Sequence, residues 1–561
     1  MLLRYYFFPF CCFPLILIAQ NDSRTVGVLS HAGEEFVQDG YNLFYPHNQA
    51  DIFLLDNCGR IVHQWLETDD ARPGNTAYIL SNGNLLKTKR LATSGPNNPI
   101  WAGGGGESIE LRDWDNQLLA SITFNDENVR LHHDIAPLPN GHVLAIAWEA
   151  FDYDAAVAAG RNPALLVDSV IWAEKIMEID LFNQQIVWEW RVWDHLIQDF
   201  DVNKANFGAV GQHPELIDLN YDVLEGVADW LHINAIDYNP RLDQIVLSVP
   251  HFDEIWIIDH STTTAEAATG SGGMANRGGD LLYRWGNPAA YRKGNVNDQT
   301  LFFQHDIAWI DDFIPEDSPF FGQLSLFNNR VTSNTSTVNF FDPGFDTVTW
   351  SYPIANGRFL PNDYTLSLQH PTDPAAMYSS GLSGAQLLAN GNVLITAGRP
   401  GYSFEMNPET EEIVWEFRNP LIGGQRIIQG TDITAANKLF FRLPRYPKDY
   451  PAFVGRDLTP GEFVELEPDV SLCENITSVA EQDPFTTSML IFPNPAQNEV
   501  QVQWPYPVEG EMEVIDLLGR TLHQQILSGF SNSTRLSVNH WQSGVYFVKL
   551  NGMVKGRLVV K

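Results

Sequence analysis

The sequence predicts an all-β protein, a six-bladed β-propeller followed by a small C-terminal β-sandwich domain. A unit of two hairpins recurs along most of the chain, and two hairpins make one four-stranded antiparallel blade. The composition agrees, because 42 Gly, 33 Pro and 12% aromatic residues in a chain of 561 residues supply many turns and strands. No long run with helical periodicity lies beyond the N-terminus.

The first hairpin of the unit turns at an Asn-Gly pair between alternating apolar residues. This pair is favoured in tight hairpins because both turn residues adopt a positive φ. The clearest copies are Asn82-Gly83, Asn140-Gly141 and Asn390-Gly391. Each marks the two leading strands of a blade.

The second hairpin joins a strand that ends near Asp to a strand that carries Trp. Copies occupy residues 52–65, 176–190, 255–285 and 403–417, with weaker ones at 108–119 and 324–350. We count units that begin near residues 28, 75, 133, 232, 305 and 383, and seven units is the alternative count. The first unit lacks a leading strand, which we expect residues 431–442 to supply from the C-terminal end of the ring.

Three consecutive units carry a histidine just ahead of the leading strand. These are His133, His232 and His305. Leading strands line the channel of a propeller, so the three imidazoles are predicted to meet. One such histidine alone would be interpreted as a hydrogen-bonded structural residue, but three in register favour a functional cluster. Asp134 and Asp306 follow two of them and are expected to point to the opposite face.

Two chemistries fit a cluster of three histidines. Neutral imidazoles bind divalent metals and leave a position open for water. Alternatively, one imidazole acts as a nucleophile or as a general acid or base on an anionic group, while the other histidines and Asn234 stabilise charge.

The N-terminal segment and the overall charge indicate an exported protein. Residues 1–20 have one early Arg, an apolar stretch and a polar exit, which predicts a cleaved signal peptide. No other segment is long and apolar enough to span a bilayer. The net charge of -35 argues against nucleic-acid partners. Outside the signal, Cys58 and Cys473 remain and could pair in an oxidising compartment.

The C-terminal end forms a separate part of the chain. Residues 466–487 are polar and acidic and are interpreted as a linker, and residues 488–561 show a compact pattern of short strands. With the segments at 492–495, 516–520 and 543–547, this tail resembles the C-terminal sorting domain of the type IX secretion system of Bacteroidota. The resemblance implies export to the cell surface or medium and the secretion machinery as a partner.

The predicted propeller, residues 21–465, resembles the bacterial arylsulfotransferases. The resemblance covers about residues 40–455 and is carried by the segments 132–142, 229–236, 254–263, 282–288, 304–306, 383–392 and 441–446. It implies a six-bladed propeller. It also implies a transferase that does not use the PAPS donor and moves a sulfuryl group between phenols through a sulfohistidine. The partners implied are a phenolic sulfate donor and a phenol acceptor, and no cofactor or metal is expected.

The resemblance also assigns roles to residues. His305 would be the nucleophile, and His133, His232 and Asn234 would bind the sulfuryl oxygens, with one histidine protonating the leaving phenolate. The family's Arg after His232 is missing from residues 248–251, where His251 is the stand-in for substrate binding. Two alternatives stay open: a metal-dependent hydrolase or sulfatase that uses the same histidines, and a non-catalytic secreted propeller that binds a ligand or protein.

Overall fold

The protein is seen here as a computed structural model that describes residues 24–47, 49–67, 72–472, 490–504, 509–516, 520–528, 533–550 and 553–561. The chain divides into two compact units between Leu472 and Cys473. The predicted signal peptide, Cys473 and most of the predicted linker lie outside the described residues. Cys58 is disulfide-bonded. Within the described residues, no helix is long and apolar enough to cross a membrane.

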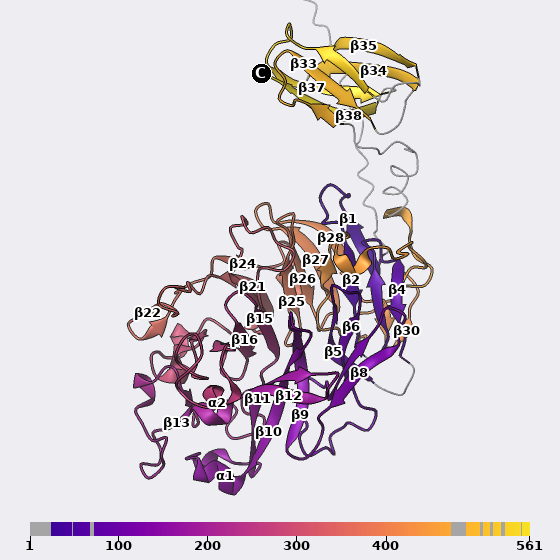
Figure 1. The fold of residues 1–561 in the computed structure, drawn as a ribbon. Helices are drawn as coiled ribbons and strands as arrows, with labels where there is room; N and C mark the ends of the chain where they lie inside the picture. The colour runs from indigo at the N-terminus through magenta and orange to yellow at the C-terminus, as the bar shows by residue number, and fades with distance from the viewer. Residues whose placement is uncertain are drawn as a thin grey trace, which may run out of the picture. The chain divides into compact units, whose positions relative to one another are not determined.

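The first unit consists of six antiparallel sheets of the propeller type, which confirms the predicted fold class (Figure 1). Blades one to three, written from the inner strand outward, are β31 (Arg445–Tyr446), β2 (Tyr41–Phe44), β3 (Ile52–Leu55), β4 (Ile61–Trp65); β5 (Arg72–Ile79), β6 (Leu85–Arg90), β7 (Ser108–Arg112), β8 (Leu118–Thr123); and β9 (Val129–Pro137), β10 (Val143–Asp152), β11 (Val170–Asp180), β12 (Gln185–Arg191).

Blades four to six follow in the same order. They are β15 (Ala235–Asn239), β16 (Gln244–Val249), β17 (Glu254–Asp259), β18 (Tyr283–Trp285); β19 (His305–Trp309), β20 (Leu324–Thr332), β21 (Thr335–Phe341), β24 (Leu366–Leu368); and β25 (Gly384–Leu387), β26 (Val393–Ala397), β27 (Tyr402–Asn407), β28 (Glu412–Arg418). Contacts between inner strands run from β5 to β9, β15 and β19 and on to β25, so these strands surround a channel.

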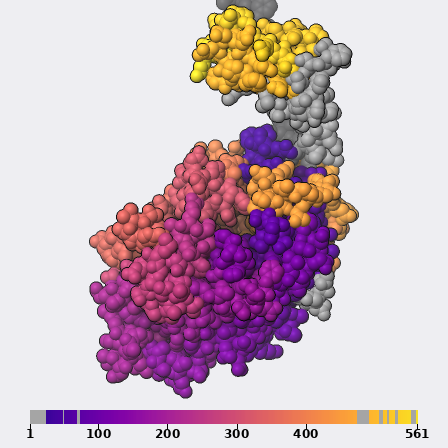
Figure 2. All heavy atoms as spheres, viewed as in Figure 1, coloured from indigo at the N-terminus to yellow at the C-terminus, as the bar shows by residue number. Residues whose placement is uncertain are grey.

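Both ends of the first unit close the ring. The C-terminal β31 pairs with β2, and Phe440 bridges to Pro46 just ahead of it. The leading strand of blade one therefore comes from the C-terminal side as predicted, although its regular part lies beyond residue 442. In Figure 2 the orange residues of this region lie against the indigo N-terminal ones.

Two of the strand assignments predicted from the sequence were wrong. The strand at residue 28 does not begin blade one, because β1 (Gly27–His31) pairs with β28 as a fifth strand of blade six. The outer strand of blade five is β24 and not residues 348–350. Trp350 has a φ of 50°, a left-handed conformation that a regular strand does not accommodate.

The tryptophans of the outer strands dock each blade on the next. Trp65, Trp190, Trp285 and Trp415 are all at most 5% exposed. Each donates its indole N–H to a carbonyl that precedes or belongs to the following blade: Asp113, Gly279, Pro361 and Asn57, respectively. A large apolar ring with one polar group suits this position, because it buries area between blades and satisfies a backbone acceptor.

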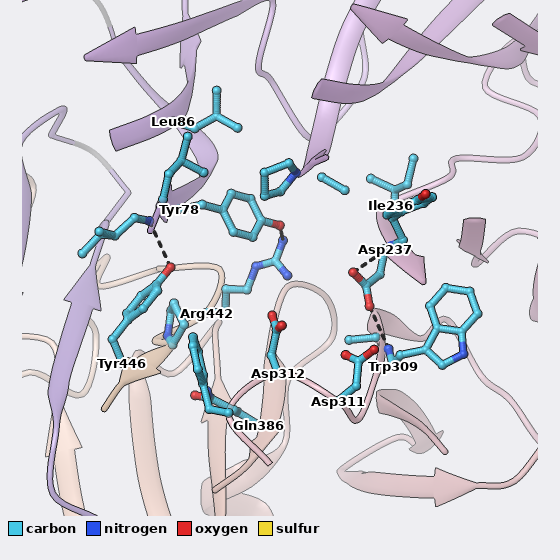
Figure 3. A pocket seen from close by; sticks show the side chains of 18 of the residues that line it. Tyr78, Leu86, Ile236, Asp237, Trp309, Asp311, Asp312, Gln386, Arg442 and Tyr446 are labelled. Carbon is cyan, nitrogen blue, oxygen red and sulfur yellow. Dashed lines mark hydrogen bonds between the residues drawn. The ribbon is translucent and has the colours of Figure 1, made fainter. Parts of the chain in front are cut away.

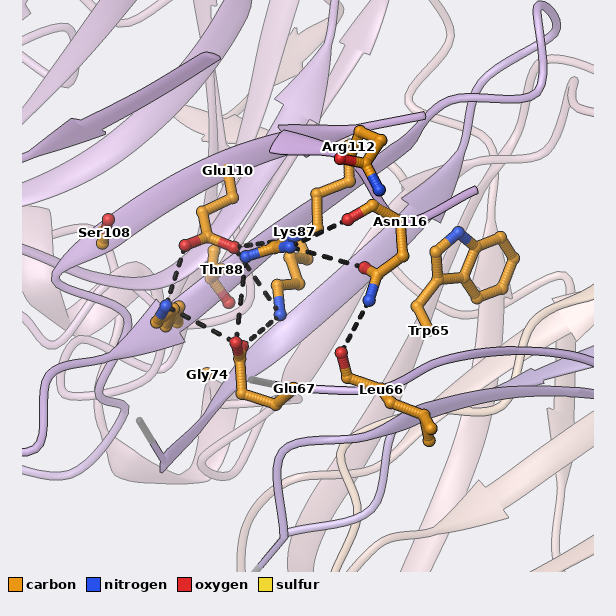
Figure 4. A network of polar contacts seen from close by, with 12 residues as sticks. Trp65, Leu66, Glu67, Gly74, Lys87, Thr88, Ser108, Glu110, Arg112 and Asn116 are labelled. Atoms are coloured by element: carbon orange, nitrogen blue, oxygen red, sulfur yellow. Dashed lines mark hydrogen bonds and ion pairs between the residues drawn. The ribbon is translucent and has the colours of Figure 1, made fainter. Parts of the chain in front are cut away.

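A buried network of charges joins blade one to blade two (Figure 4). Glu67, which follows β4, forms an ion pair with Lys87 at 2.7 Å. Glu110 pairs with Lys89 at 2.9 Å and with Arg112 at 2.8 Å. Each charge in this network faces an opposite charge, as burial requires.

Loops between strands carry the remaining elements. These are α1 (Tyr153–Ala158), α2 (Thr264–Ala267), α3 (Pro374–Met377), η1 (Pro163–Leu165), η2 (Val192–His195), η3 (Val210–Gln212), η4 (Pro288–Tyr291), η5 (Val296–Asp298) and η6 (Pro451–Phe453), and the strand pairs β13–β14 (Leu196–Ile197, Ile217–Asp218), β22–β23 (Ile354–Ala355, Arg358–Phe359) and β29–β30 (Leu421–Ile422, Gln425–Arg426).

The second unit is a β-sandwich with its own core. One sheet contains β32 (Leu490–Phe492), β33 (Glu499–Gln503) and β36 (Ser533–Ser537), and the other contains β35 (Thr521–Ser528), β34 (Glu509–Asp516), β37 (Gly544–Leu550) and β38 (Met553–Val560). Val502, Val514 and Val548, each fully buried, belong to one core cluster that both sheets share. The predicted C-terminal sandwich is confirmed.

Candidate active site

His305 is the first residue of β19 and His232 lies three residues ahead of β15, whereas His133, predicted just ahead of its strand, lies within β9. The backbone is strained at or beside all three. His133 and His232 have φ values of 53° and 58°, and Asp306, next to His305, has 57°. The ladder shifts register beside His133 and again between His305 and Ala308. Such conformations cost on the order of 1–3 kcal/mol each and cluster at functional sites.

The ring of Phe303 lies close to the rings of three histidines. Its ring lies 5.8 Å from the ring of His305, 6.3 Å from that of His232 and 5.7 Å from that of His251. The rings of His133 and His232 are 4.6 Å apart. Residues from three blades thus converge on one mouth of the channel.

His305 is held in one tautomer by Asn329 of β20. The amide nitrogen of Asn329 donates to the carbonyls of Ser379 and Leu382, both at 2.9 Å, so its oxygen faces His305. That oxygen accepts a 2.8 Å hydrogen bond from Nδ1 of His305. Nε2 therefore carries the lone pair, and burial lowers the pKa of His305 to about 3 although the bond to Asn329 opposes this. A neutral imidazole with a free lone pair can act as a nucleophile.

His232 forms a dyad with Asp229. Its Nδ1 lies 2.5 Å from Oδ2 of Asp229, whose other oxygen accepts from Nε1 of Trp148 at 3.1 Å. Burial would raise the pKa of Asp229, but the charge and hydrogen bond of His232 outweigh it and lower the pKa to about 2. The carboxylate stabilises a positive charge on His232, which suits a proton donor.

His251 stacks on His232 with the ring centroids 4.8 Å apart. Its Nδ1 donates to the Asp229 carbonyl at 2.9 Å, and burial, followed by the charge of His232, lowers its pKa to about 4. In that state Nε2 of His251 carries a lone pair and has no proton for a sulfuryl oxygen.

His133 is packed on two sides. Its Nδ1 shares a 2.8 Å hydrogen bond with Nδ1 of His132, which in turn stacks on Trp148 at 3.6 Å. A Cβ on Gly104 would lie 2.0 Å from the His133 ring, and Gly104 has a φ of 78°, so this position requires glycine. Burial lowers the pKa of both histidines well below the usual range.

Asn234 binds the backbone beside His305. Its amide nitrogen donates to the carbonyl of Gln304 at 2.9 Å, and Oδ1 is buried with no hydrogen-bond partner among the described residues. Ser248 donates to the same carbonyl at 3.2 Å. Asn234 therefore fixes the residue ahead of His305.

One group at the mouth has the composition of a metal site. Ligand atoms of Asp229, His232 and His251 lie within 4.8 Å of one another. Two imidazoles and a carboxylate suit a divalent transition metal.

Asp134 and Asp306 lie on the other side of the cluster, as predicted. Arg442 pairs with Asp134 at 2.5 Å and with Asp306 at 2.6 Å. Below them a cavity of about 640 Å³ opens between the inner strands. Figure 3 shows it with Tyr78 and Arg442 on one side and Asp237 on the other. None of the clustered histidines lines this cavity.

Sequence reasoning missed several of these groups. Asp229 stands three residues ahead of His232, within the segment 229–236, but the sequence did not indicate its role. Phe303 stands two residues before His305 and could have been found as an aromatic neighbour of the site. Asn329 and Trp148 lie on second strands, where no local pattern distinguishes them from other strand residues.

Two protein-family models match this chain. The family model described as "Arylsulfotransferase (ASST)" matches residues 45–426, and "Secretion system C-terminal sorting domain" matches residues 490–561. The sorting domain indicates a secreted or cell-surface protein. No curated protein matches the chain.

Solved structures with similar folds are distant. A protein of unknown function from Bacteroides caccae has 9% identity and a TM-score of 0.38, covering 73% of this chain and 100% of that one. Virginiamycin B lyase from Staphylococcus aureus has 11% identity and a TM-score of 0.32, covering 71% and 90%.

Proposed function

The chain belongs to the arylsulfotransferase family, whose model covers more than half of it, and from this premise we propose a specific reaction. The protein moves a sulfuryl group from a phenolic sulfate ester to a phenol without the PAPS donor, through a sulfohistidine on His305. The family makes it a sulfotransferase enzyme, whereas the covalent route and the residue roles are our proposal.

In the first half-reaction, Nε2 of His305 attacks the sulfur of the aryl sulfate. The N–S bond forms while the S–O bond to the phenol breaks, and the electron pair leaves on the phenolate oxygen. His232, in its protonated form and with Nδ1 on Asp229, gives the phenolate its proton. The second half-reaction runs in reverse: His232 takes the proton of the acceptor phenol, whose oxygen attacks the sulfohistidine.

One observation carries this proposal, the hydrogen bond that fixes the tautomer of His305. With Nδ1 donating to Asn329 at 2.8 Å, the lone pair of Nε2 is free, and no hydrogen bond to Nε2 occurs among the described residues. A histidine kept neutral by burial is nucleophilic without deprotonation.

The other predicted residues act around the sulfuryl group. His133 and His232 are proposed to bind its oxygens, where negative charge spreads in the transition state. Asn234 holds the backbone ahead of His305 and is proposed to support the sulfuryl site through it. His251 occupies the place of the family's Arg, and we assign it to orient His232 by stacking.

Intact-mass analysis of the mature protein after brief exposure to 4-nitrophenyl sulfate tests the proposal. We expect a mass increase of one sulfuryl group that resists a chelator and is absent in His305→Ala. His213→Ala, which changes an exposed histidine remote from the cluster, is the matched control and should form the adduct. Lack of both adduct and phenol release would favour a ligand-binding propeller.

A second candidate is a metal-dependent hydrolase, favoured by the grouping of Asp229, His232 and His251. Metal-bound water would then attack the ester. Release of 4-nitrophenol without an adduct, lost on chelation and restored by Zn²⁺, would establish this reaction in place of the covalent one.

A further inference from the structure

The half of the channel mouth that faces the histidines is positively charged. Arg90 ends β6 of blade two, Arg399 follows β26 of blade six, and His47 follows β2 of blade one. Arg330 of β20 extends this group toward the nucleophile. We call these four residues the arginine arc. Together with the histidines, every blade contributes a cationic or imidazole group to one mouth.

Arg399 and Arg330 flank His305. An ideal Cβ on Gly381 would lie 3.7 Å from Nη2 of Arg399 and 3.8 Å from Cε1 of His305, so both side chains border the same point. The guanidinium of Arg330 lies 3.5 Å from the centre of the Phe303 ring. Phe303 thereby links Arg330 to the nucleophile.

Arg90 and His47 continue the arc away from His305. Arg90 lies against Gly105, where a Cβ would be 1.9 Å from its Nε, and its guanidinium is 5.5 Å from the Trp101 ring. Burial, and then the charges of Arg90 and Arg399, lower the pKa of His47 to about 4. Both arginines are therefore near enough to His47 for their charges to act on it.

Glu107 acts on Arg90 and Asp253 acts on Arg330 through their charges, but neither forms an ion pair with the arc. Within the described part of the chain, no carboxylate lies within ion-pair distance of Arg90, Arg330 or Arg399, although the sequence has 69 Asp and Glu residues. Buried arginines elsewhere are paired: Arg130 with Glu107 and Arg284 with Glu254, both at 2.5 Å. Arg330 and Arg399 are exposed and Arg90 is partly buried, so these guanidinium groups are open to a ligand that supplies an anion.

Two buried atoms of the arc also lack hydrogen-bond partners. These are Nε of Arg90 and Nε2 of His47. Buried polar atoms in proteins usually have a partner, so these two atoms of the arc are free to bind a polar group of a ligand. A simple aryl sulfate carries one negative charge, and the proposed mechanism already assigns its sulfuryl group to the histidines. The arginine arc is therefore left for a different group of the substrate.

We propose that the arginine arc binds a second anionic group on the phenol. This rests on the proposed sulfotransferase function and names its substrate class: phenols that carry a carboxylate or a sulfonate on the ring. The sulfuryl group sits over His305, the ring lies against Phe303, and the second anion is held by Arg399 and Arg90. Bidentate guanidinium contacts suit either oxyanion.

Acceptor selectivity tests the proposal. With 4-nitrophenyl sulfate as donor, kcat/KM is measured for phenol, 4-hydroxybenzoate, 4-hydroxybenzenesulfonate and tyramine. We expect both anionic acceptors to be preferred over phenol by about tenfold or more, and tyramine to be the poorest. A preference for only one anion would identify which oxyanion the arc accepts.

Variants locate the selectivity. Arg90→Gln and Arg399→Gln should each reduce the ratio of kcat/KM for 4-hydroxybenzoate to that for phenol by about tenfold. Arg277→Gln makes the same charge change at an exposed position outside the mouth and should keep the wild-type ratio. If the arginine variants lower both values equally and leave the ratio unchanged, the arginines serve the sulfuryl group and the proposal is wrong.

Calorimetric titration separates this proposal from the sulfotransferase function. 4-Hydroxybenzoate, phenol and tyramine are titrated into His305→Ala, in which no transfer is possible. Tighter binding of 4-hydroxybenzoate, lost when Arg90→Gln is added, supports the arc even if no sulfohistidine forms in the wild type. Equal affinity for the three ligands would overturn it whatever the activity.

Discussion

Asn329 decides which nitrogen of His305 carries the lone pair, although it lies on a different strand from the histidine. Both of its amide protons are committed to the carbonyls of Ser379 and Leu382, so its oxygen can only accept. The histidine must donate from Nδ1 as a result. Under the proposed mechanism we assign Asn329 as a positioning residue that acts through His305.

We predict that Asn329→Ala lowers the rate of adduct formation by about 10–100-fold, because the ring is no longer held in one tautomer. Asn329→Asp puts a carboxylate on Nδ1, which should raise the pKa of His305 from about 3. The single-turnover rate measured from pH 4 to 8 should then decline at the acid end. A purely structural role would lower the rate without changing the pH profile.

At the scale of elements, His260 links blades three and four. It follows β17 and lies 2.6 Å from Asp243 of its own blade and 3.1 Å from Glu178 of β11. Burial disfavours the charged ring, but these two hydrogen bonds outweigh it and raise the pKa of His260 to about 9.

We predict that this contact weakens at alkaline pH. The pKa of His260 in the folded state exceeds its ordinary value of 6.5, so the stabilisation is complete below pH 6.5 and is lost as the pH rises through 9. The loss is on the order of 3 kcal/mol. Thermal unfolding from pH 6 to 10 should show a smaller decline in Tm for His260→Gln than for the wild type, and equal declines would refute the link.

At the scale of the whole molecule, Arg442 ties the ring together across its channel. It belongs to the closing segment of blade one and pairs with Asp134 of blade three and Asp306 of blade five. Tyr78 of blade two donates to the same carboxylate of Asp134 at 2.9 Å. This belt lies between the histidine cluster and the cavity of Figure 3.

We predict that Arg442→Met destabilises the first unit by about 3–5 kcal/mol, because two buried carboxylates lose their counter-charge. Urea unfolding followed by tryptophan fluorescence measures the change. Adding Asp134→Asn and Asp306→Asn removes both charges and should recover part of the stability. If the triple variant is less stable than Arg442→Met, the carboxylates have other stabilising partners.

Much of the fold follows from local pattern. Asn140-Gly141 and Asn390-Gly391 make hairpins through their own conformational preference, and the alternating strands beside them need one buried face. The two wrong strand assignments fell where the sequence has no turn motif to mark the strand. The strand at residue 28 looks the same whether it starts one blade or completes another, and only ring closure assigns it to blade six.

The sequence by itself determined the propeller, the sandwich tail and the positions of His133, His232 and His305 at one point of a repeat. Tertiary structure alone decided what surrounds them. Asn329, Arg90, Arg399 and Arg442 reach the channel from separate blades, and they meet only because the inner strands form a closed ring. Contacts between residues tens to hundreds of positions apart leave no local pattern, so no spacing in the sequence could reveal them.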